Sequence, residues 1–426
     1  MLVRTFQPRD EQAMNEVIQK SFKNPGANAY PLPPSRFVVI AELDGKVAGH
    51  TSIRPMLFHV GGSILRAGVL HMVGTDPAYQ KRGIGHAMLD KAVEIMRSER
   101  LVLSFLETPV PRFYASKGWE VIRERVEISV SRAAVETRAS KAPVGIELRD
   151  GSIDRLASYV ALRERMANKC WFFVYTNEGY MKQLVEKACQ GSLVDFFNEI
   201  WRDDRLVGYV LGNRDASVKN GESLRISIQE LALDEYEPGL VASVFKELLA
   251  FDDEFEAVSA GFHVVPGLAA AMKEFGGTEN KIGGNVDMVR INMVKEFFEA
   301  IRGQLDDALA DFLHDEKLGF ANDVIIDVDG ERVTLSRASG HLVIHEGGST
   351  KGNRGAVFAL TRNDLARIVA GQTTPSTLVR EGKACCEPQA ALEQLDAMFL
   401  LQPVVINYRN NFFQAHMKEM GIAPDQ

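Results

Sequence analysis

The stretch Val73-Gly-Thr-Asp-Pro-Ala-Tyr-Gln-Lys-Arg-Gly-Ile-Gly-His-Ala-Met-Leu89 decides the fold of the N-terminal part of the chain. The apolar run at residues 67–73 predicts a strand, and the amphipathic pattern at residues 84–97 predicts a helix. Two glycines in the turn between them allow a tight bend and a close approach of the backbone to a bound group. The first helical turn then offers unpaired N–H groups and the positive end of the helix dipole, beside Lys81 and Arg82. This turn is therefore expected to bind a diphosphate.

The pattern of this turn favours an acyl-coenzyme A over a nucleotide as the source of the diphosphate. The Walker pattern is absent, and the segment Gly83-Ile-Gly-His-Ala87 lacks the third glycine of a dinucleotide fingerprint. The strand end is also expected to pair with the amide-bearing arm of the cofactor, as an added strand would. The expected cofactor-binding residues are Val73, Gly74, Thr75, Gln80, Lys81, Arg82, Gly83, Ile84, Gly85 and His86.

Two segments in this part of the chain carry a family resemblance. Gln80-Lys-Arg-Gly-Ile-Gly85 resembles the acetyl-CoA signature Q/R-x-x-G-x-G/A of the GCN5-related N-acetyltransferases (GNAT). After a predicted buried strand at residues 101–106, Phe113-Tyr-Ala-Ser-Lys-Gly-Trp119 is similar to the F-Y-x-x-x-G-W/F segment of the same family. The element order β-α-β-β-β-α-β-α-β through residue 131 matches the acetyltransferase fold. The resemblance implies that acetyl-CoA is the co-substrate and that an amine attacks its thioester directly.

The same order of elements repeats in residues 141–293, but the chemistry of the turn is lost. Residues 226–233 correspond to the strand predicted at residues 67–73, and residues 239–250 correspond to the helix predicted after the turn. The turn itself reads Asp234-Glu-Tyr-Glu-Pro-Gly239, in which carboxylates repel a diphosphate and Pro238 lacks a backbone donor. The sequence therefore predicts a catalytic GNAT domain at residues 1–140 and a degenerate GNAT-like domain at residues 141–293.

Residues 294–426 resemble the sterol carrier protein-like domains, on the pattern L-T-x-x-D-L-A-R-I-V-A-G and the helix that follows it. Such a domain either carries an apolar ligand or serves as a wall and an oligomer surface. Two acetyltransferase-like domains followed by a carrier-like domain resemble the layout of the enhanced-intracellular-survival (Eis-type) N-acetyltransferases. The expected fold class is α/β (α+β), with tandem GNAT folds followed by a sterol carrier protein-like α+β domain. The resemblance also implies a homo-oligomer.

The resemblance assigns a general acid but leaves the general base open. It implies that Tyr114 protonates the leaving thiolate, since a phenol with a pKa of about 10 is protonated at neutral pH. A backbone N–H at the end of the strand at residues 67–73 can stabilise the oxyanion. Eis-type enzymes use the chain-terminal carboxylate, placed just after an aromatic pair. Here Phe412-Phe413 is followed by thirteen residues, so either the carboxylate of Gln426 loops back, or another group such as Glu107, or a water, takes over.

Composition and charge narrow the range of partners. The net charge of −8 argues against nucleic-acid binding, which needs a basic surface. No run approaches the ~18 apolar residues that span a bilayer, and the N-terminus lacks the apolar segment of a signal peptide. Four cysteines without a C-x-x-C pattern predict reduced thiols. These features predict a cytoplasmic protein without membrane or nucleic-acid partners.

Two further expectations concern metals and the acceptor. His341 and His345 share a face of a predicted strand, but no carboxylate or cysteine pattern completes a metal site, so none is predicted. The acceptor amine belongs either to a small molecule or to a peptide, and sequence does not distinguish between them. The alternative function is a non-catalytic binding protein that holds an apolar ligand in its carrier-like domain. The intact segment Gln80–Gly85 argues against this alternative.

Overall fold

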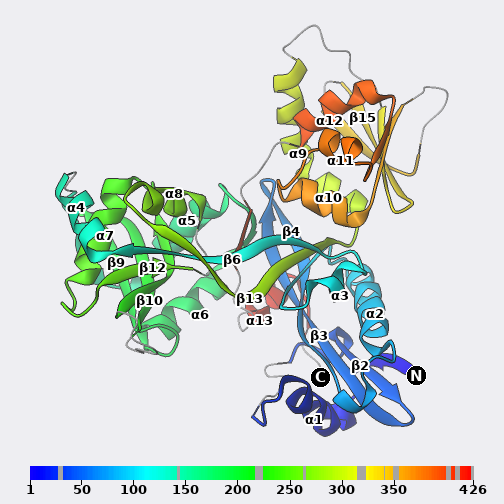
Figure 1. The fold of residues 1–426 in the computed structure, drawn as a ribbon, viewed down its shortest axis with the longest axis horizontal. Coiled ribbons are helices and arrows are strands. Elements are labelled where there is room, and N and C mark those ends of the chain that lie inside the picture. Colours follow the sequence, from blue (N-terminus) through cyan, green and yellow to red (C-terminus); the bar gives the residue numbers. More distant parts are fainter. Residues whose placement is uncertain are drawn as a thin grey trace. The chain divides into compact units, whose positions relative to one another are not determined.

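The structure is a computed structural model of the 426-residue chain. It describes all residues except 27–31, 142–143, 216–223, 262–264, 314–322, 340, 349–354, 400–403, 408–412 and 424–426. The described chain divides into two compact units (Figure 1). Unit 1 comprises Met1–Arg123, Val286–Val404 and Arg409–Gln426, and unit 2 comprises Glu124–Asn285 and Val405–Tyr408. The expected three-domain division at residues 140 and 293 stays a prediction.

The first sheet of unit 1 contains the strands that the N-terminal sequence predicts. Its order is β1 (Leu2–Thr5), β2 (Val38–Leu43), β3 (Lys46–Val60), β4 (Ser63–Thr75), β5 (Leu103–Thr108) and the Val286–Ile291 part of β13 (Thr278–Ile291). β2 pairs antiparallel with β3, and β3 pairs antiparallel with β4. β4 runs parallel to β5, which requires the crossover helix that the sequence pattern indicates.

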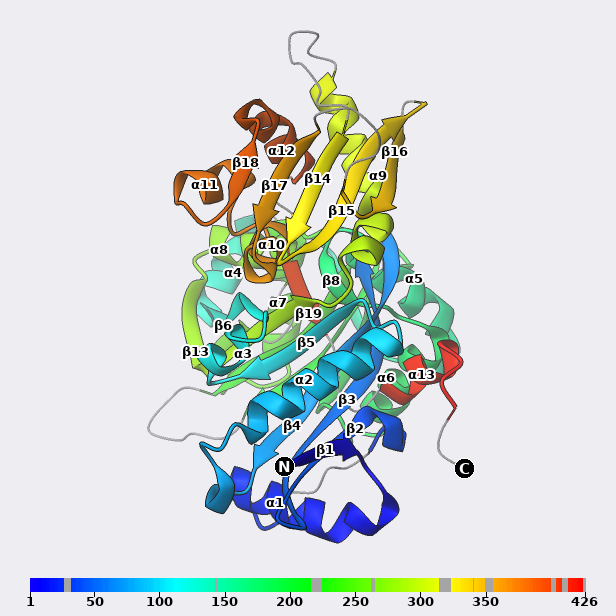
Figure 2. The same cartoon turned by 90° about the vertical axis from the view of Figure 1, so that its right-hand side faces the viewer.

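Helices cover both faces of this sheet. On one face, Met14 and Ile18 of α1 (Glu11–Phe22) form a buried apolar cluster with Val38 and Ile40 of β2. On the other face lies α2 (Ile84–Ser98), which crosses the strands in Figure 2. Its side chains pack so closely that a Cβ on Gly49 of β3 would meet the sulfur of a methionine of α2 at 2.8 Å. The short α3 (Pro111–Ala115) follows β5, and α13 (Phe413–Glu419) packs against β3.

The strand that ends the predicted order at residue 131 exists as β6 (Glu120–Ser131) and pairs antiparallel with β12 (Ala257–Ala260). The neighbour of β5 is β13, which pairs with it antiparallel. The alternating pattern of a strand does not specify which partner it takes, so the sequence predicts these strands but not their pairing.

Unit 2 repeats the arrangement of elements found around β4. Its sheet has the order β6, β12, β11 (Arg225–Leu233), β10 (Arg205–Asp215), β9 (Phe196–Arg202) and β7 (Glu147–Asp150), and β8 (Trp171–Val174) pairs with β19 (Val404–Asn407). β11 runs parallel to β12 and carries a bulge at Gln229, opposite β10. The helices of the unit are α4 (Arg132–Lys141), α5 (Leu156–Ala167), α6 (Glu178–Cys189), α7 (Pro238–Leu249) and α8 (Pro266–Glu274). The strand at residues 226–233 and the helix at residues 239–250 that the sequence predicts are confirmed as β11 and α7.

The C-terminal part of unit 1 holds a separate five-stranded sheet, which fits a further domain. Its order is β16 (His341–Glu346), β15 (Glu331–Ala338), β14 (Asp323–Val328), β17 (Ala356–Leu360) and β18 (Cys385–Glu387). The accompanying helices are α9 (Val294–Leu313), α10 (Arg362–Val369), α11 (Pro375–Arg380) and α12 (Leu392–Met398). Within the described residues, the 3₁₀ turns are η1 (Pro8–Asp10), η2 (Ser35–Phe37), η3 (Pro77–Tyr79), η4 (Ile153–Arg155) and η5 (Gln389–Ala391). None of the helices among the described residues combines the length and apolar composition needed to cross a lipid bilayer.

Candidate active site

The end of β4 departs from regular sheet geometry. A register shift between His50 and Ser52 of β3 leaves Met72 and Val73 of β4 as a bulge, in which Met72 has a φ of 56°. On its other side β4 pairs with β5 only as far as Val69. Beyond that point the two strands diverge, and the described residues supply no strand partner for the backbone edge of residues 70–75 on this side. Such an edge can pair with the amides of an extended ligand.

The turn after β4 presents backbone amides without intrahelical acceptors. The N-cap residue of α2 is Gly83, which has a φ of 78° and no side chain to bond the first helical turn. The first hydrogen bond of the helix runs from the Ala87 amide to the Gly83 carbonyl, at 3.1 Å. The amides of Ile84, Gly85 and His86 therefore point out of the helix start, as the first amides of a helix do. Together with the helix dipole they favour a bound anion.

Two cations stand beside these amides. Lys81 and Arg82 are both exposed, and Lys81 has a φ of 62° within the turn. The guanidinium carbon of Arg82 lies 5.6 Å from the ring centroid of Tyr79 in η3. Within the described part of the chain, neither cation forms an ion pair with a carboxylate. Their charges are thus available to a phosphate group.

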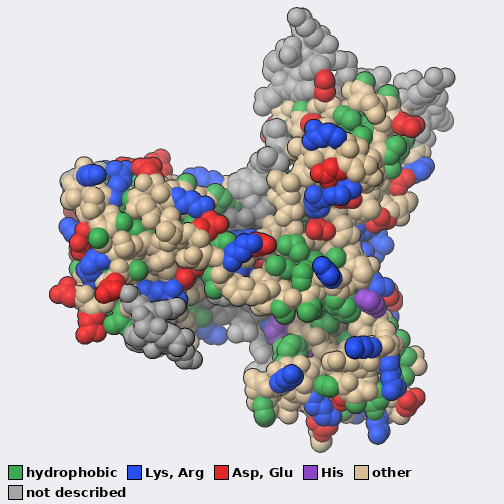
Figure 3. All heavy atoms as spheres, in the orientation of Figure 1, with side chains coloured by type: hydrophobic (Ala, Val, Ile, Leu, Met, Phe, Trp, Pro, Cys, Tyr) green, Lys and Arg blue, Asp and Glu red, His purple; other side chains and the backbone are tan. Residues whose placement is uncertain are grey.

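The second signature segment packs directly against this turn. A Cβ on Gly85 would lie 2.7 Å from Cζ of Phe113 in α3, so only glycine allows this approach without a shift of the aromatic ring. The rings of His86 and Phe113 stack with centroids 4.8 Å apart, and Nε2 of His86 lies 3.3 Å from the Ser116 hydroxyl. Figure 3 shows hydrophobic side chains gathered in this region of unit 1. The structure thus brings together the two segments that the sequence singles out.

Tyr114 lies at the diverging end of β5. Its side chain is buried, and burial raises the pKa of Tyr114 to about 12, against a smaller lowering by a hydrogen bond with the side chain of Thr108. Thr108 is the last residue of β5, which places the phenol next to the point where β4 and β5 part. A phenol with this pKa is protonated at neutral pH and can donate a proton.

The sheet face that α1 covers carries a basic group and two histidines. Gly74 pairs with His50, and a Cβ on Gly74 would lie 3.0 Å from the hydroxyl of Ser21 in α1, so the side chain of His50 faces α1. Arg54 faces α1 as well, because alternate residues of β3 point to the same side. His71 shares this face because it pairs with Ser52, which lies between His50 and Arg54 in the same alternation. Burial lowers the pKa of His50 to about 4. Burial, and next the charge of Arg54, lower the pKa of His71 to about 3. Both imidazoles are therefore neutral at neutral pH.

The proton of His50 can be placed on one nitrogen. Its Nδ1 lies 3.2 Å from the carbonyl oxygen of Met72 in the bulge. A carbonyl only accepts, so Nδ1 carries the proton and Nε2 is left as an acceptor. Nε2 is buried and has no hydrogen-bond partner among the described residues, and the same holds for Nδ1 of His71. Sequence analysis did not single out His50 or Arg54.

The chain end contributes an aromatic residue to this face. Phe413 of α13 is fully buried, and the guanidinium carbon of Arg54 lies 5.2 Å from its ring centroid. The Leu57 amide of β3 donates to Nδ1 of His416 in the same helix, at 3.4 Å. One member of the expected aromatic pair thus reaches the first sheet of unit 1. Gln426, the expected carboxylate base, lies outside the described residues, so its role stays a prediction.

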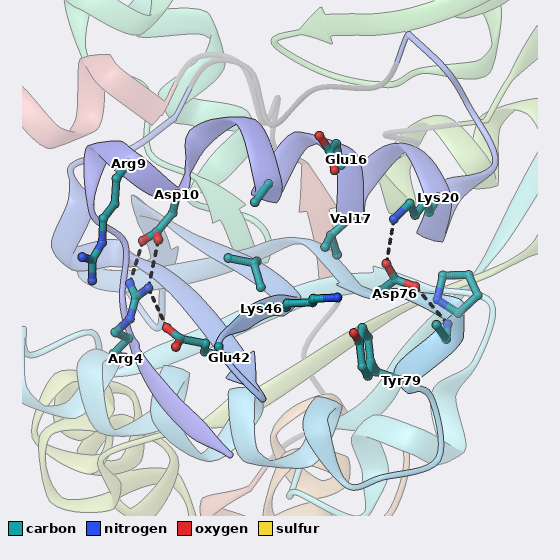
Figure 4. Close-up of a pocket in the computed structure, with 15 residues that line it drawn as sticks. Arg4, Arg9, Asp10, Glu16, Val17, Lys20, Glu42, Lys46, Asp76 and Tyr79 are labelled. Atoms are coloured by element: carbon teal, nitrogen blue, oxygen red, sulfur yellow. Dashed lines mark hydrogen bonds and ion pairs between the residues drawn. The ribbon is translucent and has the colours of Figure 1, made fainter.

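A separate polar cavity of about 1080 Å³ lies between α1, the β2–β3 turn and η3 (Figure 4). Its lining residues carry charges of both signs; they are Arg4, Arg9, Asp10, Ala13, Glu16, Val17, Lys20, Glu42, Gly45, Lys46, Val47, Asp76, Pro77, Ala78 and Tyr79. Arg4 pairs with Asp10 and Glu42 at one end, at 2.6 and 3.1 Å. Lys20 and Asp76 pair at the other end, 3.0 Å apart, and Lys46 lies between the two groups in Figure 4.

These ion pairs hold the start of the turn between β4 and α2 in place. Asp76 directly follows β4, and its carboxylate accepts from the Ala78 amide and from Lys20, at 2.9 and 3.0 Å. Burial alone would raise the pKa of Asp76, but these two donors keep that pKa below its ordinary value. The paired charges identify the cavity as a structural link between α1 and the turn, rather than as a second anion site.

The equivalent turn of unit 2 has different chemistry. Pro238 is the first residue of α7, so this helix start lacks one amide donor. Asp234 is paired with Arg165 and Arg205, at 2.5 and 2.8 Å. Its carboxylate is therefore neutralised, whereas the sequence suggested that it would repel an anion. The ring of Tyr236 packs so closely against Gly267 that a Cβ on Gly267 would lie 2.8 Å from Cδ2 of the ring. This turn offers no pair of unpaired cations comparable to Lys81 and Arg82.

Comparison with known proteins identifies the class of the N-terminal segment. Residues 2–122 match the sequence profile of the acetyltransferase (GNAT) domain. The matched segment holds the bulge, the turn between β4 and α2, and Tyr114. The match supports acyl transfer as the chemistry of the site.

The fold of nearly the whole chain is similar to that of solved acetyltransferases. A GCN5-related N-acetyltransferase from Anabaena variabilis has a TM-score of 0.72 at 16% identity, over 96% of this chain and 100% of that chain. Eis1 from Mycobacterium abscessus has a TM-score of 0.64 at 17% identity, over 96% and 100%. A probable N-acyltransferase from Enterococcus faecalis has a TM-score of 0.70 at 13% identity, over 96% and 99%. These similarities confirm the expected fold class, while the likeness of residues 294–426 to sterol carrier proteins stays a prediction.

Proposed function

We propose that the protein is an acetyl-CoA-dependent N-acetyltransferase that acts on an amine of a small molecule or peptide. The junction of β4 and α2 is the observation that carries this proposal. There the outward amides of Ile84, Gly85 and His86 meet the exposed cations Lys81 and Arg82. This combination suits the diphosphate of coenzyme A. The neighbouring edge of β4 suits the amides of its pantetheine arm.

The proposed reaction is a direct transfer from sulfur to nitrogen. Acetyl-CoA supplies the thioester when bound, and an amide of the bulge, such as that of Val73, donates to the oxyanion that forms as the amine attacks. The new C–N bond forms and the C–S bond breaks, and the thiolate takes the hydroxyl proton of Tyr114. The amine gives its own proton to a base. The carboxylate of Gln426, that of Glu107 and a water are the candidates that the sequence leaves open.

The domain organisation is part of the same proposal. We infer a catalytic domain at residues 1–140, a degenerate copy at 141–293 and a sterol carrier protein-like domain at 294–426. Support for the degenerate copy comes from the recurrence in unit 2 of a bulged strand that runs parallel to the next strand across a helix. Homo-oligomer formation and a cytoplasmic location remain predictions from the sequence.

Replacement of Arg82 by glutamate is expected to abolish the stabilisation by acetyl-CoA. A ligand present at 100 times its Kd adds about 2.7 kcal/mol to the free energy of unfolding, so acetyl-CoA should raise the Tm of the wild type. Arg82→Glu puts a carboxylate beside the diphosphate and should remove this shift. Lys91→Glu makes the same change of charge further along α2, where Lys91 pairs with Glu94. This control variant should keep the rise in Tm with acetyl-CoA. No shift in the wild type at millimolar acetyl-CoA would contradict the proposal.

A further inference from the structure

The segment that follows α3 is held by side chains from the C-terminal part of unit 1. The carbonyl oxygen of Lys117 accepts from Nε of Arg290 in β13, at 2.9 Å. The carbonyl oxygen of Trp119 accepts from Nδ2 of Asn363 in α10, at 2.8 Å. The same Nδ2 lies 3.4 Å from the carbonyl oxygen of Ala115, the last residue of α3. Donors that lie 173 to 248 residues further along the chain thus fix this short segment.

The helix α3 depends on such contacts for its position. It has five residues, and an isolated helix shorter than about 12 residues is marginal in water. On one side, Phe113 of α3 packs against Gly85 at the start of α2. On the other side, the carbonyls at the end of α3 and just after it accept from Arg290 and Asn363. Side chains from the C-terminal part of unit 1 therefore complete the support of this helix.

Gly118 allows two arginines to come close to the backbone of this segment. Its φ is 86°, and a Cβ at this position would lie 3.3 Å from Nε of Arg290 and 3.3 Å from Cδ of Arg362. Both the positive φ and the close approach favour glycine here. Gly118 is the glycine of the segment Phe113–Trp119 that the sequence singles out. The structure explains this glycine by side chains from outside that segment.

The groups that hold the segment are themselves held by hydrogen bonds. Nη1 of Arg290 donates to Oδ1 of Asn292, at 2.7 Å. Asn292 is fully buried, and its Nδ2 donates to the carbonyl oxygen of Leu101 before β5, at 2.9 Å. At the start of α10, Nη2 of Arg362 donates to Oε2 of Glu331, at 2.8 Å. These hydrogen bonds restrict the movement of β13 and of the start of α10 beside α3.

Tyr114 is connected to this support through its backbone and its ring. Its carbonyl oxygen accepts from the Lys117 amide, at 2.9 Å. Its ring meets that of Trp119 edge-on, with centroids 6.4 Å apart, and the guanidinium carbon of Arg290 lies 5.6 Å from the Trp119 centroid. A shift of the segment after α3 would therefore move Tyr114 as well. A displacement of about 1 Å at a reacting group can cost about a hundredfold in rate.

We propose that Arg290 and Asn363 are positioning residues for the proton donation by Tyr114, an inference that rests on the proposed function. They hold the carbonyls of Lys117 and Trp119 and so keep α3 at the end of β5. The chemical step stays as described: the C–S bond breaks, and the thiolate takes the hydroxyl proton of Tyr114. The C-terminal part of unit 1 thus contributes to the rate of transfer through the placement of the general acid.

A double-mutant cycle in the full-length protein tests whether Asn363 acts through the hydroxyl of Tyr114. The measurement is thiol release from acetyl-CoA with n-butylamine, or with the primary amine that the wild type acetylates fastest. Asn363→Ala should lower kcat by about ten- to a hundredfold and leave the KM for acetyl-CoA unchanged, because the acid is displaced and the cofactor site is not. In the Tyr114→Phe background the same change should alter kcat by less than about twofold. Arg290→Gln should give the same pattern in a second cycle.

The matched control is Gln372→Ala. Nε2 of Gln372 donates to the carbonyl oxygen of Val121, within β6, at 2.9 Å, so kcat should be unchanged. A rise in Tm with acetyl-CoA shows that each variant is folded and binds the cofactor. Should Asn363→Ala not fold, the cycle with Arg290→Gln decides, and failure of both to fold overturns the positioning role.

The remaining outcomes separate this inference from the function itself. An active wild type with unchanged kcat in both Asn363→Ala and Arg290→Gln overturns this inference alone. Equal losses of kcat with and without the Tyr114 hydroxyl do the same, because the two residues would then act independently of the acid. A wild type that acetylates neither n-butylamine nor any other primary amine overturns the proposed function as well.

Discussion

Replacement of Tyr114 by phenylalanine is expected to lower kcat by about 10²- to 10⁴-fold, the usual contribution of a general acid. The phenol is the group that protonates the leaving thiolate, and its pKa of about 12 keeps it protonated throughout the neutral range. The ring would stay in place, because its edge-on contacts with Phe113 and Trp119 do not involve the hydroxyl. Affinity for acetyl-CoA should therefore be unchanged.

The measurement for Tyr114 is steady-state release of the coenzyme A thiol, with cofactor binding measured separately. Tyr79→Phe is the matched control, because it removes the hydroxyl of a tyrosine that does not adjoin β5. The phenylalanine ring would keep the contact that Tyr79 makes with Arg82. A pH–rate profile adds a second test: the wild type should show no loss of rate from Tyr114 until the pH nears 12. Unchanged turnover in Tyr114→Phe would remove this residue from the role of acid.

Replacement of Glu230 by alanine is expected to destabilise unit 2 by about 3–5 kcal/mol, the cost of breaking a buried ion pair from one side. Arg163 of α5 and Glu230 of β11 are buried, and Nε of Arg163 lies 2.9 Å from Oε1 of Glu230. The guanidinium also stacks over the rings of Phe173 and Tyr180, with centroids at 4.8 and 5.0 Å. The variant would leave the Arg163 cation buried without its main counter-charge.

Urea unfolding, followed by the fluorescence of the tryptophans of unit 2, measures this loss. Glu235→Ala is the control, because Glu235 is an exposed acid of the turn after the same strand, where substitutions usually change stability by less than about 0.5 kcal/mol. A cost below about 1 kcal/mol for Glu230→Ala would show that the pair contributes little. Binding of acetyl-CoA to unit 1 should persist under conditions in which the variant is folded.

The geometry of the turn between β4 and α2 could be predicted from sequence because its determinants are local. Gly83 has a positive φ as N-cap residue, and Gly85 has no room for a side chain beside Phe113. Both requirements leave glycines at fixed spacing, which is what the signature detects. Tyr114 was predicted for the same reason, since it follows Phe113 within one short segment.

The surroundings of the sheet in unit 1 could not be predicted because they are assembled from distant segments. Asp287 lies opposite Glu107 because β13, about 180 residues further along the chain, pairs with β5. A strand's alternation shows which residues share a face, but not which strand lies beside it. Arg54 reads as an ordinary strand residue, yet it is buried beneath Phe413, which comes from the chain end.

Hydrogen–deuterium exchange of the full-length protein with and without acetyl-CoA tests whether the cofactor binds at the junction of β4 and α2. We expect acetyl-CoA to slow exchange of the amides at residues 73–75 and 83–87, which lie on the edge of β4 and at the start of α2. The matching segment of unit 2, residues 228–239, should show no change and serves as an internal control. Protection of residues 228–239 instead, or unchanged exchange throughout residues 73–87 at saturating acetyl-CoA, would show that the cofactor does not bind at this junction.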